Sequence, residues 1–444
     1  MSKTIAALAT APGISGLAVI RLSGIKSFEL IDKCFKGRLR ISDAQSHTIH
    51  YGKIYDDNVL IDSVTISVFR SPNSYTGEDV VEIGCHGGNI ISNIILDLLY
   101  KLGATLPEPG EFTKRAFLNN KLDLTQVEAV ADLIHSISKP SAEFSARQLN
   151  GQLSKKLSEL RQQLLDIAGF LELEIDFADE DIQFLDRNEI LNKINDTIHF
   201  CDNLISLHKS SDIIKSGYFV SFVGFPNSGK SSLFNTLLYK KRAIVSDIAG
   251  TTRDYLEEYI YINELPIKLI DTAGIRESEN VIEIEGIKLV EDVLLNSNLI
   301  FVINDISLGD NHSTELYEGL KKRYNNVFLL HNKIDLVGQS TAQGLSISAV
   351  SSEGIDDLKS FIFKEANKSF SRTNDVLIND RQSYLLTGIV DSLNNAINAI
   401  NNNFENELIA IDLKEAINSI GKINGETWNE EVINNIFSNF CIGK

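Results

Sequence analysis

The chain has 444 residues, of which 43% are hydrophobic and 23% are charged. At about 100–200 residues per domain, this length predicts two to four globular domains. The net charge of −18 argues against a generally basic nucleic-acid coat and against adhesion to anionic membranes. No apolar run reaches the roughly 18–20 residues that cross a bilayer, and no signal peptide is recognisable. The four cysteines are scattered without a C-x-x-C pair, so we expect a protein of the reducing cytoplasm, without disulfides or a Cys-based zinc site.

Residues 1–118 alternate short apolar runs with Gly and Pro. The runs 17–22 and 64–69 are typical of strands bounded by turns. A helix is expected near residues 90–102. This first segment is therefore predicted to form a compact α+β domain.

From about residue 119 the pattern changes to long helical periodicity, and helices are expected to continue to about residue 212. Apolar residues recur there at spacings of three and four, which is the period of one helix face: Leu153, Leu157, Leu160, Leu164, Ile167 and Leu171. A second stripe follows residue 370: Leu385, Ile389, Leu393, Ile397, Ile400, Phe404, Leu408 and Ile411. It runs through the three Asn residues 401–403 and predicts folded helix there instead of a low-complexity segment. Because two such stripes can bury each other, residues 119–212 and 370–444 are predicted to form one all-α domain.

Between these helical parts, residues 216–368 follow a strand–loop–helix pattern. The short apolar runs 218–223, 267–270, 299–303 and 327–330 suit parallel strands that are covered on both faces. The predicted fold class is therefore multidomain. It combines an α+β N-terminal domain, an all-α domain and an inserted α/β P-loop domain with a mostly parallel sheet.

Residues 224–231 read GFPNSGKS and fit the pattern G-x-x-x-x-G-K-[ST]. They follow an expected strand and open an apolar helical stretch, which is the context that a phosphate-binding loop requires. Lys230 is expected to neutralise the β- and γ-phosphates, and Ser231 is expected to bind Mg²⁺. The phosphate-contacting residues predicted from this loop are Asn227, Ser228, Gly229, Lys230, Ser231 and Ser232.

Two further motifs at strand ends favour GTP. Asp271, Thr272, Ala273 and Gly274 form a D-x-x-G element, in which Asp271 holds magnesium through water and the Gly274 N–H senses the γ-phosphate. Asn332, Lys333 and Asp335 belong to an N-K-x-D element. The Asp335 carboxylate can accept the N1–H and N2–H₂ donors of guanine, a pair that adenine lacks. Ser348 and Ala349 are expected to back the base with a main-chain N–H.

Hydrolysis needs a device other than the glutamine of Ras-type enzymes, because Ile275 stands directly after D-x-x-G. Asn227 could coordinate a monovalent cation against the phosphates and so supply the charge of an arginine finger. A carboxylate further along could position the attacking water. Spacing alone leaves four candidates for it: Glu277, Glu279, Glu283 and Glu285.

These motifs resemble those of the Ras-like, translation-factor-related GTPases over residues 216–368. Residues 246–254, SDIAGTTRD, resemble the first switch of bacterial GTPases related to Era. The resemblance implies further nucleotide contacts at Ser246, Asp247, Ile248, Ala249, Gly250, Thr251 and Thr252. Of these, Thr252 would be the second protein ligand for Mg²⁺.

Four motifs outside this segment extend the resemblance to the whole chain: PNSYTGED at 72–79, PGEF at 109–112, AFLNNKLDL at 116–124 and the terminal FCIGK at 440–444. Together with the domain order, they resemble the MnmE (TrmE) family of tRNA modification GTPases. This resemblance implies a homodimer that works with the flavoprotein MnmG in a heterotetrameric complex, with FAD on that partner. The pair would install (carboxymethyl)aminomethyl groups at C5 of the wobble uridine, position 34, of certain tRNAs. It also implies potassium-activated GTP hydrolysis and a tetrahydrofolate one-carbon donor bound by the N-terminal domain.

Residue roles follow from the same resemblance. Potassium would be held by Asn227, Ser246, Ile248 and Thr251, and Glu283 would be the catalytic glutamate. Folate would contact Arg21, Glu82, Lys121 and Lys444, whose charges suit folate carboxylates and the pterin donors. Cys441 matches a functional C-terminal cysteine.

Two other readings of the sequence remain. One is an Era-like RNA- or ribosome-binding switch, for which no basic RNA module is visible at a net charge of −18. The other is a GTP-binding scaffold that hydrolyses nothing.

Overall fold

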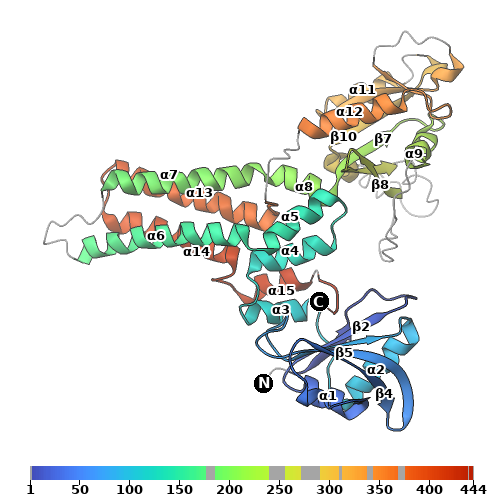
Figure 1. Cartoon of the computed structure of the whole chain (residues 1–444). Coiled ribbons are helices and arrows are strands. Elements are labelled where there is room, and N and C mark those ends of the chain that lie inside the picture. The colour runs from blue at the N-terminus through green and yellow to red at the C-terminus, as the bar shows by residue number, and fades with distance from the viewer. Residues whose placement is uncertain are drawn as a thin grey trace. The chain divides into compact units, whose positions relative to one another are not determined.

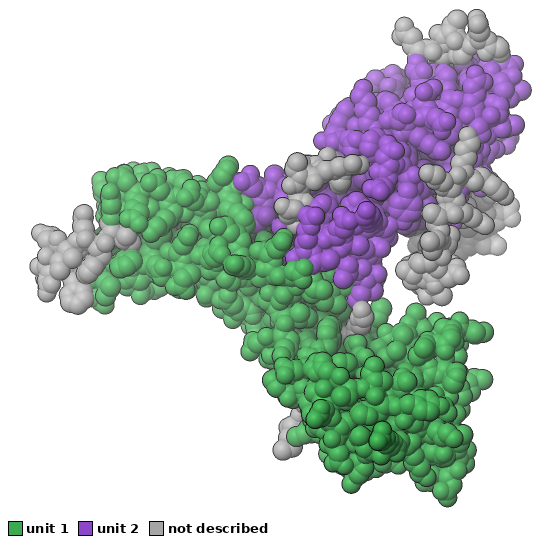
Figure 2. Space-filling model, in the orientation of Figure 1, with its two compact units in different colours: residues 1–131, 148–201, 384–444 green, residues 132–147, 202–383 purple. Residues whose placement is uncertain are grey.

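The computed structural model describes residues 3–176, 186–239, 256–271, 291–309, 313–337, 344–368, 376–438 and 440–443. The chain divides into two compact units, coloured separately in Figure 2. The first unit comprises residues 1–131, 148–201 and 384–444, and the second comprises 132–147 and 202–383. Among the described residues, no helix combines the length and the hydropathy that a membrane crossing requires.

The N-terminal part of the first unit is built on a six-stranded antiparallel sheet (Figure 1). Its strand order is β1 (Ile5–Leu8), β2 (Ala18–Ser23), β6 (Val80–Cys85), β5 (Val59–Phe69), β4 (Thr48–Asp56) and β3 (Phe35–Gly37). Apolar side chains of α1 (Ser27–Cys34) and α2 (Asn89–Leu102) share one core with one face of the sheet. Along β5, Val64, Ile66 and Val68 are buried in this core, whereas Thr65 between them is exposed. This alternation gives the strand one apolar face, so the α+β prediction is confirmed.

The remainder of the first unit is helical. Its helices are α3 (Glu111–Leu118), α4 (Leu124–Ile134), α5 (Lys139–Leu149), α6 (Gln152–Asp176), α7 (Arg187–Ser206), α13 (Asp380–Asn401), α14 (Asn406–Asn424) and α15 (Glu430–Ser438), of which α4, α5, α7 and α13 continue into the second unit. Helices α6 and α14 pack against each other and run antiparallel. Asn424 Nδ2 reaches Ser158 Oγ at 3.1 Å, and at the other end Asn406 Nδ2 reaches Glu174 Oε2 at 2.9 Å. Segments more than 200 residues apart therefore form one bundle, as an inserted α/β segment requires.

The two predicted apolar stripes differ in outcome. Every residue of the first stripe is buried on α6. The second stripe is wrong beyond Ile400, because α13 ends at Asn401 and α14 begins only at Asn406. Asn403 has φ +54°, a left-handed conformation that Asn tolerates and that ends a helix. Asn402 and Asn403 therefore form a turn, and Leu408 and Ile411 after it are 49% and 60% exposed, so the stripe does not continue.

The second unit contains an α/β fold with a six-stranded sheet (Figure 1). The strand order is β12 (Leu345–Ser346), β11 (Val327–Asn332), β10 (Leu299–Asp305), β7 (Tyr218–Val223), β9 (Leu265–Asp271) and β8 (Leu256–Ile262). All neighbours are parallel except β8, which pairs antiparallel with β9. The helices that lie wholly within the described residues of this unit include α8 (His208–Ser216), α9 (Lys230–Tyr239), α11 (Thr314–Lys321) and α12 (Ile355–Lys368). The mostly parallel sheet confirms the predicted fold class.

All residues of strand β10 are buried, which explains why the strands of this sheet form continuous apolar runs in the sequence. Phe301 packs into a core shared with α9 and α12, whereas Ile300 and Val302 pack toward α11 on the opposite face. Strand β7 lies between β10 and β9, where the strand order reverses. Ligands of open α/β sheets bind beyond the carboxyl ends of the strands at such a switch point.

Candidate functional site

The predicted phosphate loop joins the carboxyl end of β7 to the first turn of α9. Two of its residues have positive φ: Asn227 at +62° and Gly229 at +94°. A Cβ at Gly229 would lie only 2.1 Å from Asn332 Nδ2, so glycine is required there by conformation and by space. The loop is thus wound tightly and opens onto a helix N-terminus, where backbone N–H groups favour an anion.

Polar groups converge inside this loop. Lys230 is 8% exposed and its Nζ donates to the carbonyls of Gly224 and Phe225 at 3.0 and 2.9 Å. The hydroxyl of Ser228 is buried and has no hydrogen-bond partner among the described residues. Because a buried unsatisfied hydroxyl is costly, a loop that keeps one fits a polar ligand. Ser231 and Ser232 follow on the first turn of α9 and are exposed.

Asn332 of the N-K-x-D element connects its own loop with the loop before α9 and with the 348–349 segment. Its Nδ2 donates to the Ser228 carbonyl at 2.9 Å, and its Oδ1 accepts the Ala349 N–H at 3.1 Å. The side chain is 1% exposed. The N-K-x-D element is therefore fixed to both the loop before α9 and the 348–349 segment.

The rest of the N-K-x-D element lies at the same sheet edge. Lys333 has φ +69°, which turns the chain sharply after β11, and its Nζ lies 2.5 Å from Asp305 Oδ2. Asp335 is exposed, and its carboxylate makes no hydrogen bond or ion pair with another described residue. An acceptor in this state is available to the N–H donors of a guanine base.

The predicted main-chain donors of the 348–349 segment are engaged within the protein. The Ser348 N–H donates to the Glu353 carbonyl at 3.0 Å, and the Ala349 N–H donates to Asn332. A main-chain contact from this segment to the base stays a prediction.

Several predicted site residues lie outside the described residues: Ser246, Asp247, Ile248, Ala249, Gly250, Thr251, Thr252, Thr272, Ala273, Gly274, Glu283 and Lys444. Asp271 ends β9, and its backbone is paired with that of Phe222 in β7. The D-x-x-G element therefore begins beside the strand that feeds the phosphate loop.

A second cluster of predicted residues lies on the N-terminal sheet. Arg21 and Glu82 face each other across β2 and β6, and Arg21 Nε donates to Glu82 Oε1 at 2.8 Å. The guanidinium lies over two aromatic rings, with its Cζ 5.2 Å from the ring centre of Tyr75 and 5.8 Å from that of Phe112. The Arg21 guanidinium is thus held in place by a carboxylate and by two rings, of which Phe112 is fully buried.

Lys121 lies close to the loop of residues 72–79, which contains Tyr75. A Cβ at Gly77 would lie 3.4 Å from Lys121 Cε, and Gly77 is two residues after Tyr75. The loop is anchored because Thr76 Oγ1 lies 2.7 Å from Ser23 Oγ at the end of β2. The structure thus gathers three of the predicted folate contacts around residues 72–79.

The segment that carries Cys441 lies against the N-terminal sheet. Cys441 is exposed, and its carbonyl accepts the Gly110 N–H at 3.4 Å. Gly443 has φ +105°, and a Cβ there would lie 2.1 Å from the Leu8 carbonyl oxygen. Leu8 pairs with Ile20, the neighbour of Arg21. Cys441 is therefore held near the strand that carries Arg21.

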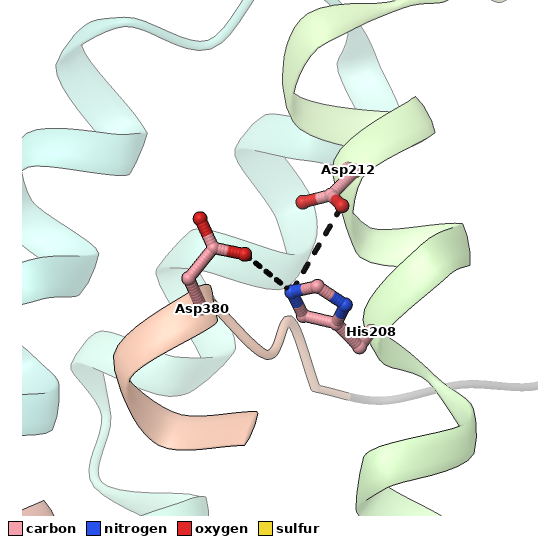
Figure 3. A group of neighbouring side chains, drawn as sticks. All are labelled: His208, Asp212 and Asp380. Carbon is pink, nitrogen blue, oxygen red and sulfur yellow. Dashed lines mark hydrogen bonds and ion pairs between the residues drawn. The ribbon is translucent and has the colours of Figure 1, made fainter. Parts of the chain in front are cut away.

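A separate group of ionisable side chains joins α8 to the start of α13 (Figure 3). His208 Nε2 lies 2.8 Å from Asp380 Oδ1 and 3.9 Å from Asp212 Oδ2. Burial and the charge of Asp380 raise the pKa of Asp212, against the opposing effect of His208. The Asp380 side chain is 96% exposed, so this geometry supports an ion pair that ties the two segments together more than a metal centre.

The sequence analysis assigned no role to several residues of these sites. Tyr75 and Phe112 lie within quoted motifs, but only the fold places both rings beneath Arg21. Asp305 is the last residue of the buried strand β10, at the carboxyl edge of the sheet where ligands bind, and this position could have indicated it in the sequence.

Two family models match this chain, and proteins of known name resemble it over its whole length. The family described as GTP-binding protein TrmE N-terminus matches residues 4–121, and the MnmE helical domain matches residues 124–441. The tRNA modification GTPase MnmE of Thermoanaerobacter pseudethanolicus is 39% identical over 99% of both chains. Proteins of the same name from Flavobacterium johnsoniae and Carboxydothermus hydrogenoformans are 38% and 37% identical, over 99% and 100% of both chains respectively.

Among solved structures, the G domain of the T. maritima FeoB iron transporter is 26% identical with a TM-score of 0.27, over 34% of this chain and 98% of that one. Aquifex aeolicus Era is 27% identical with a TM-score of 0.28, over 39% of this chain and 66% of that one. At such TM-scores the structural likeness carries no argument. The full-length sequence matches do, and they show that this chain belongs to the MnmE family of tRNA modification GTPases.

Proposed function

We propose that this GTP hydrolase is activated by potassium and modifies the wobble uridine of certain tRNAs in the cytoplasm. It acts as a homodimer in a heterotetrameric complex with an MnmG-type flavoprotein that carries FAD. The product is an aminomethyl or carboxymethylaminomethyl group at C5 of uridine 34, and its one-carbon unit comes from a tetrahydrofolate derivative.

One observation carries the proposal: the Cys441 segment is held beside the Arg21 strand. The contact between Gly443 and Leu8 places the C-terminal tail on β1, next to the strand that carries Arg21. A GTP switch on its own does not require an exposed cysteine near a strand that carries a paired arginine. The arrangement fits a chain that handles both a nucleotide and a one-carbon donor.

The residues of the second cluster fit a folate. Lys121 and Lys444 would bind the carboxylates, whereas Glu82, with Arg21 paired to it, would lie at the pterin end and accept the pterin N–H donors. The half-buried ring of Tyr75 offers flat apolar surface to a flat ligand, whereas Phe112 is fully buried and supports Arg21 from within the core. The bound tetrahydrofolate derivative supplies a one-carbon unit, and Cys441 is the nearby exposed thiol of this chain.

In the nucleotide site, Ser231 and Thr252 would hold Mg²⁺. Asn227, Ser246, Ile248 and Thr251 would hold K⁺, which supplies positive charge beside the phosphates. Asn227 is exposed at the tip of the phosphate loop with positive φ, which leaves its amide available to an ion. Glu283 would position the attacking water, since Ile275 cannot.

The domain assignment that goes with this function is 1–118 for folate binding and dimerisation and 216–368 for GTP hydrolysis. Residues 119–212 and 370–444 form the helical domain, which ends in the Cys441 motif.

The test is nucleoside mass spectrometry of tRNA from cells that lack this gene and carry either the wild-type chain or Cys441→Ser. We expect the variant to hydrolyse GTP normally but to leave uridine 34 unmodified. Normal modification by the variant would refute the role of Cys441. Unchanged tRNA in the deletion strain, with GTP-dependent copurification on ribosomes, would favour an Era-like switch instead.

Potassium is tested separately with the purified chain. GTP turnover is measured in potassium chloride and in sodium chloride at equal ionic strength. We expect much faster turnover in potassium for the wild type and a loss of this difference in Asn227→Ala. Equal rates of the wild type in both salts would remove potassium from the mechanism.

A further inference from the structure

Asp305 is a buried carboxylate at the edge of the nucleotide site. It is the last residue of β10 and is 3% exposed. Its Oδ2 accepts from Lys333 Nζ at 2.5 Å, and its Oδ1 accepts from the N–H and the hydroxyl of Ser307 at 3.1 and 2.6 Å. Both oxygens are therefore bonded, and the side chain has one fixed orientation.

The sheet register explains why these two charges meet. Strands β10 and β11 are parallel neighbours, and Asp305 is paired with Asn332. Lys333 comes next in the chain, and its positive φ turns the backbone at this edge. The short helices η3 (Ile306–Leu308) and η4 (Ile334–Leu336) follow the two strands and contact each other. The ion pair thus links the ends of two adjacent strands.

The charge of Asp305 persists at neutral pH. Burial by itself raises the pKa of this carboxyl group, but the hydrogen bonds from Lys333 and Ser307 outweigh burial and hold the pKa below its ordinary value. Lys333 is more open, with a side chain that is 28% exposed against 5% for Asp305. Asp305 is therefore the fixed member of the ion pair, and Lys333 is the member that is open to solvent.

We propose that Asp305 is a positioning residue of the guanine site, which holds the Lys333 ammonium at the sheet edge. The apolar stem of Lys333 is then kept extended between Asn332, which braces the phosphate loop, and Asp335, which is free to read the base. A lysine stem carries large rotamer freedom, and its loss on binding costs affinity unless the stem is ordered beforehand. Asp305 therefore strengthens the binding of the whole purine and adds no selectivity for the 2-amino group.

The experiment measures the affinity of the full-length chain for fluorescent GDP and for inosine diphosphate, together with kcat at saturating GTP. We expect Asp305→Ala to weaken GDP binding by about ten- to a hundredfold, the effect of losing a charged hydrogen bond. Asp305→Asn keeps an acceptor and is expected to lose about three- to tenfold. The ratio of the GDP and inosine diphosphate affinities stays at the wild-type value, and kcat stays within about twofold.

A control variant and a double variant distinguish positioning of Lys333 from a general structural role of Asp305. Ser307→Ala removes one bond to Asp305 but leaves the ion pair, and its affinity is expected to stay within about threefold of wild type. Lys333→Met keeps the apolar stem without its charge, and adding Asp305→Asn to it should weaken binding no further. Additive losses in that double variant would overturn the proposal. Wild-type affinity of Asp305→Asn, or a fall in kcat without a change in affinity, would overturn it as well.

If Asp305→Ala does not fold, the nucleotide affinities of the Asp305→Asn and Lys333→Met variants test the proposal. The proposal concerns nucleotide affinity alone. Its outcome is independent of the potassium, folate and tRNA assignments.

Discussion

Replacing Asn332 by alanine should destabilise the nucleotide-binding fold, because its side-chain amide is the hydrogen-bond partner of two buried backbone groups. The side chain is 1% exposed, and Ser228 and Ala349, whose backbone groups it bonds, are 2% and 6% exposed. Each buried group left without a partner costs about 1–3 kcal/mol. We therefore expect Asn332→Ala to lower the stability of the nucleotide-binding fold by about 2–4 kcal/mol, with some relief from water entry.

The loss should be local and measurable at one amide. Hydrogen exchange at the Ala349 N–H is expected to accelerate by roughly 30- to 1,000-fold, the factor that corresponds to this energy. Urea unfolding followed by circular dichroism reports the global change. Asn296→Ala is the matched control, since Asn296 is exposed and, among the described residues, its Nδ2 donates to the Asp292 carbonyl alone, at 2.9 Å. We expect that control to cost less than about 0.5 kcal/mol. If Asn332→Ala costs no more than Asn296→Ala, the bracing role assigned to Asn332 is wrong.

Two further predictions concern the first unit. Gly443→Ala should displace the tail from β1, because a Cβ would meet the Leu8 carbonyl oxygen at 2.1 Å and φ is +105°. GTP turnover should remain while tRNA modification falls, as measured by nucleoside mass spectrometry; Gly388→Ala, where nothing lies within 4 Å, is the control, and equal modification in both variants would contradict the placement of the tail. Alkylation of the folded chain by iodoacetamide at pH 8 should modify exposed Cys441 first, because burial raises the pKa of Cys34 to about 12 and that of Cys85 to about 11, which keeps both thiols protonated. Peptide mass mapping measures the order, and labelling of Cys34 at the rate of Cys441 would contradict the reasoning.

The loop between β7 and α9 could be predicted from the sequence because its motif is local. The segment 224–231 must be a tight turn before a helix, and the structure has that turn between β7 and α9. Continuous apolar runs likewise predicted β7, β10 and β11, since strands buried on both faces need no alternation. The stripe on α6 predicted a buried helix face for the same reason.

Short-range patterns failed where a single backbone conformation decided the outcome. The apolar spacing of residues 385–411 favoured unbroken helix, yet the left-handed conformation of Asn403 ends it. The spacing of apolar residues cannot reveal a turn when the residues on both sides of it keep the helical spacing. The chain therefore reverses at 402–405, and α14 packs back against α6.

The sequence by itself determined which chemical groups each segment carries: a G-x-x-x-x-G-K-[ST] loop, the carboxylate of an N-K-x-D element, charged residues of the N-terminal domain and a cysteine near the C-terminus. Only the tertiary structure decided which of these groups meet. Arg21 lies over rings from two distant segments, Lys333 is paired with Asp305 from the neighbouring strand, and the tail of Cys441 lies against β1. Such contacts depend on strand register and on packing between residues far apart in the chain, which no local motif encodes.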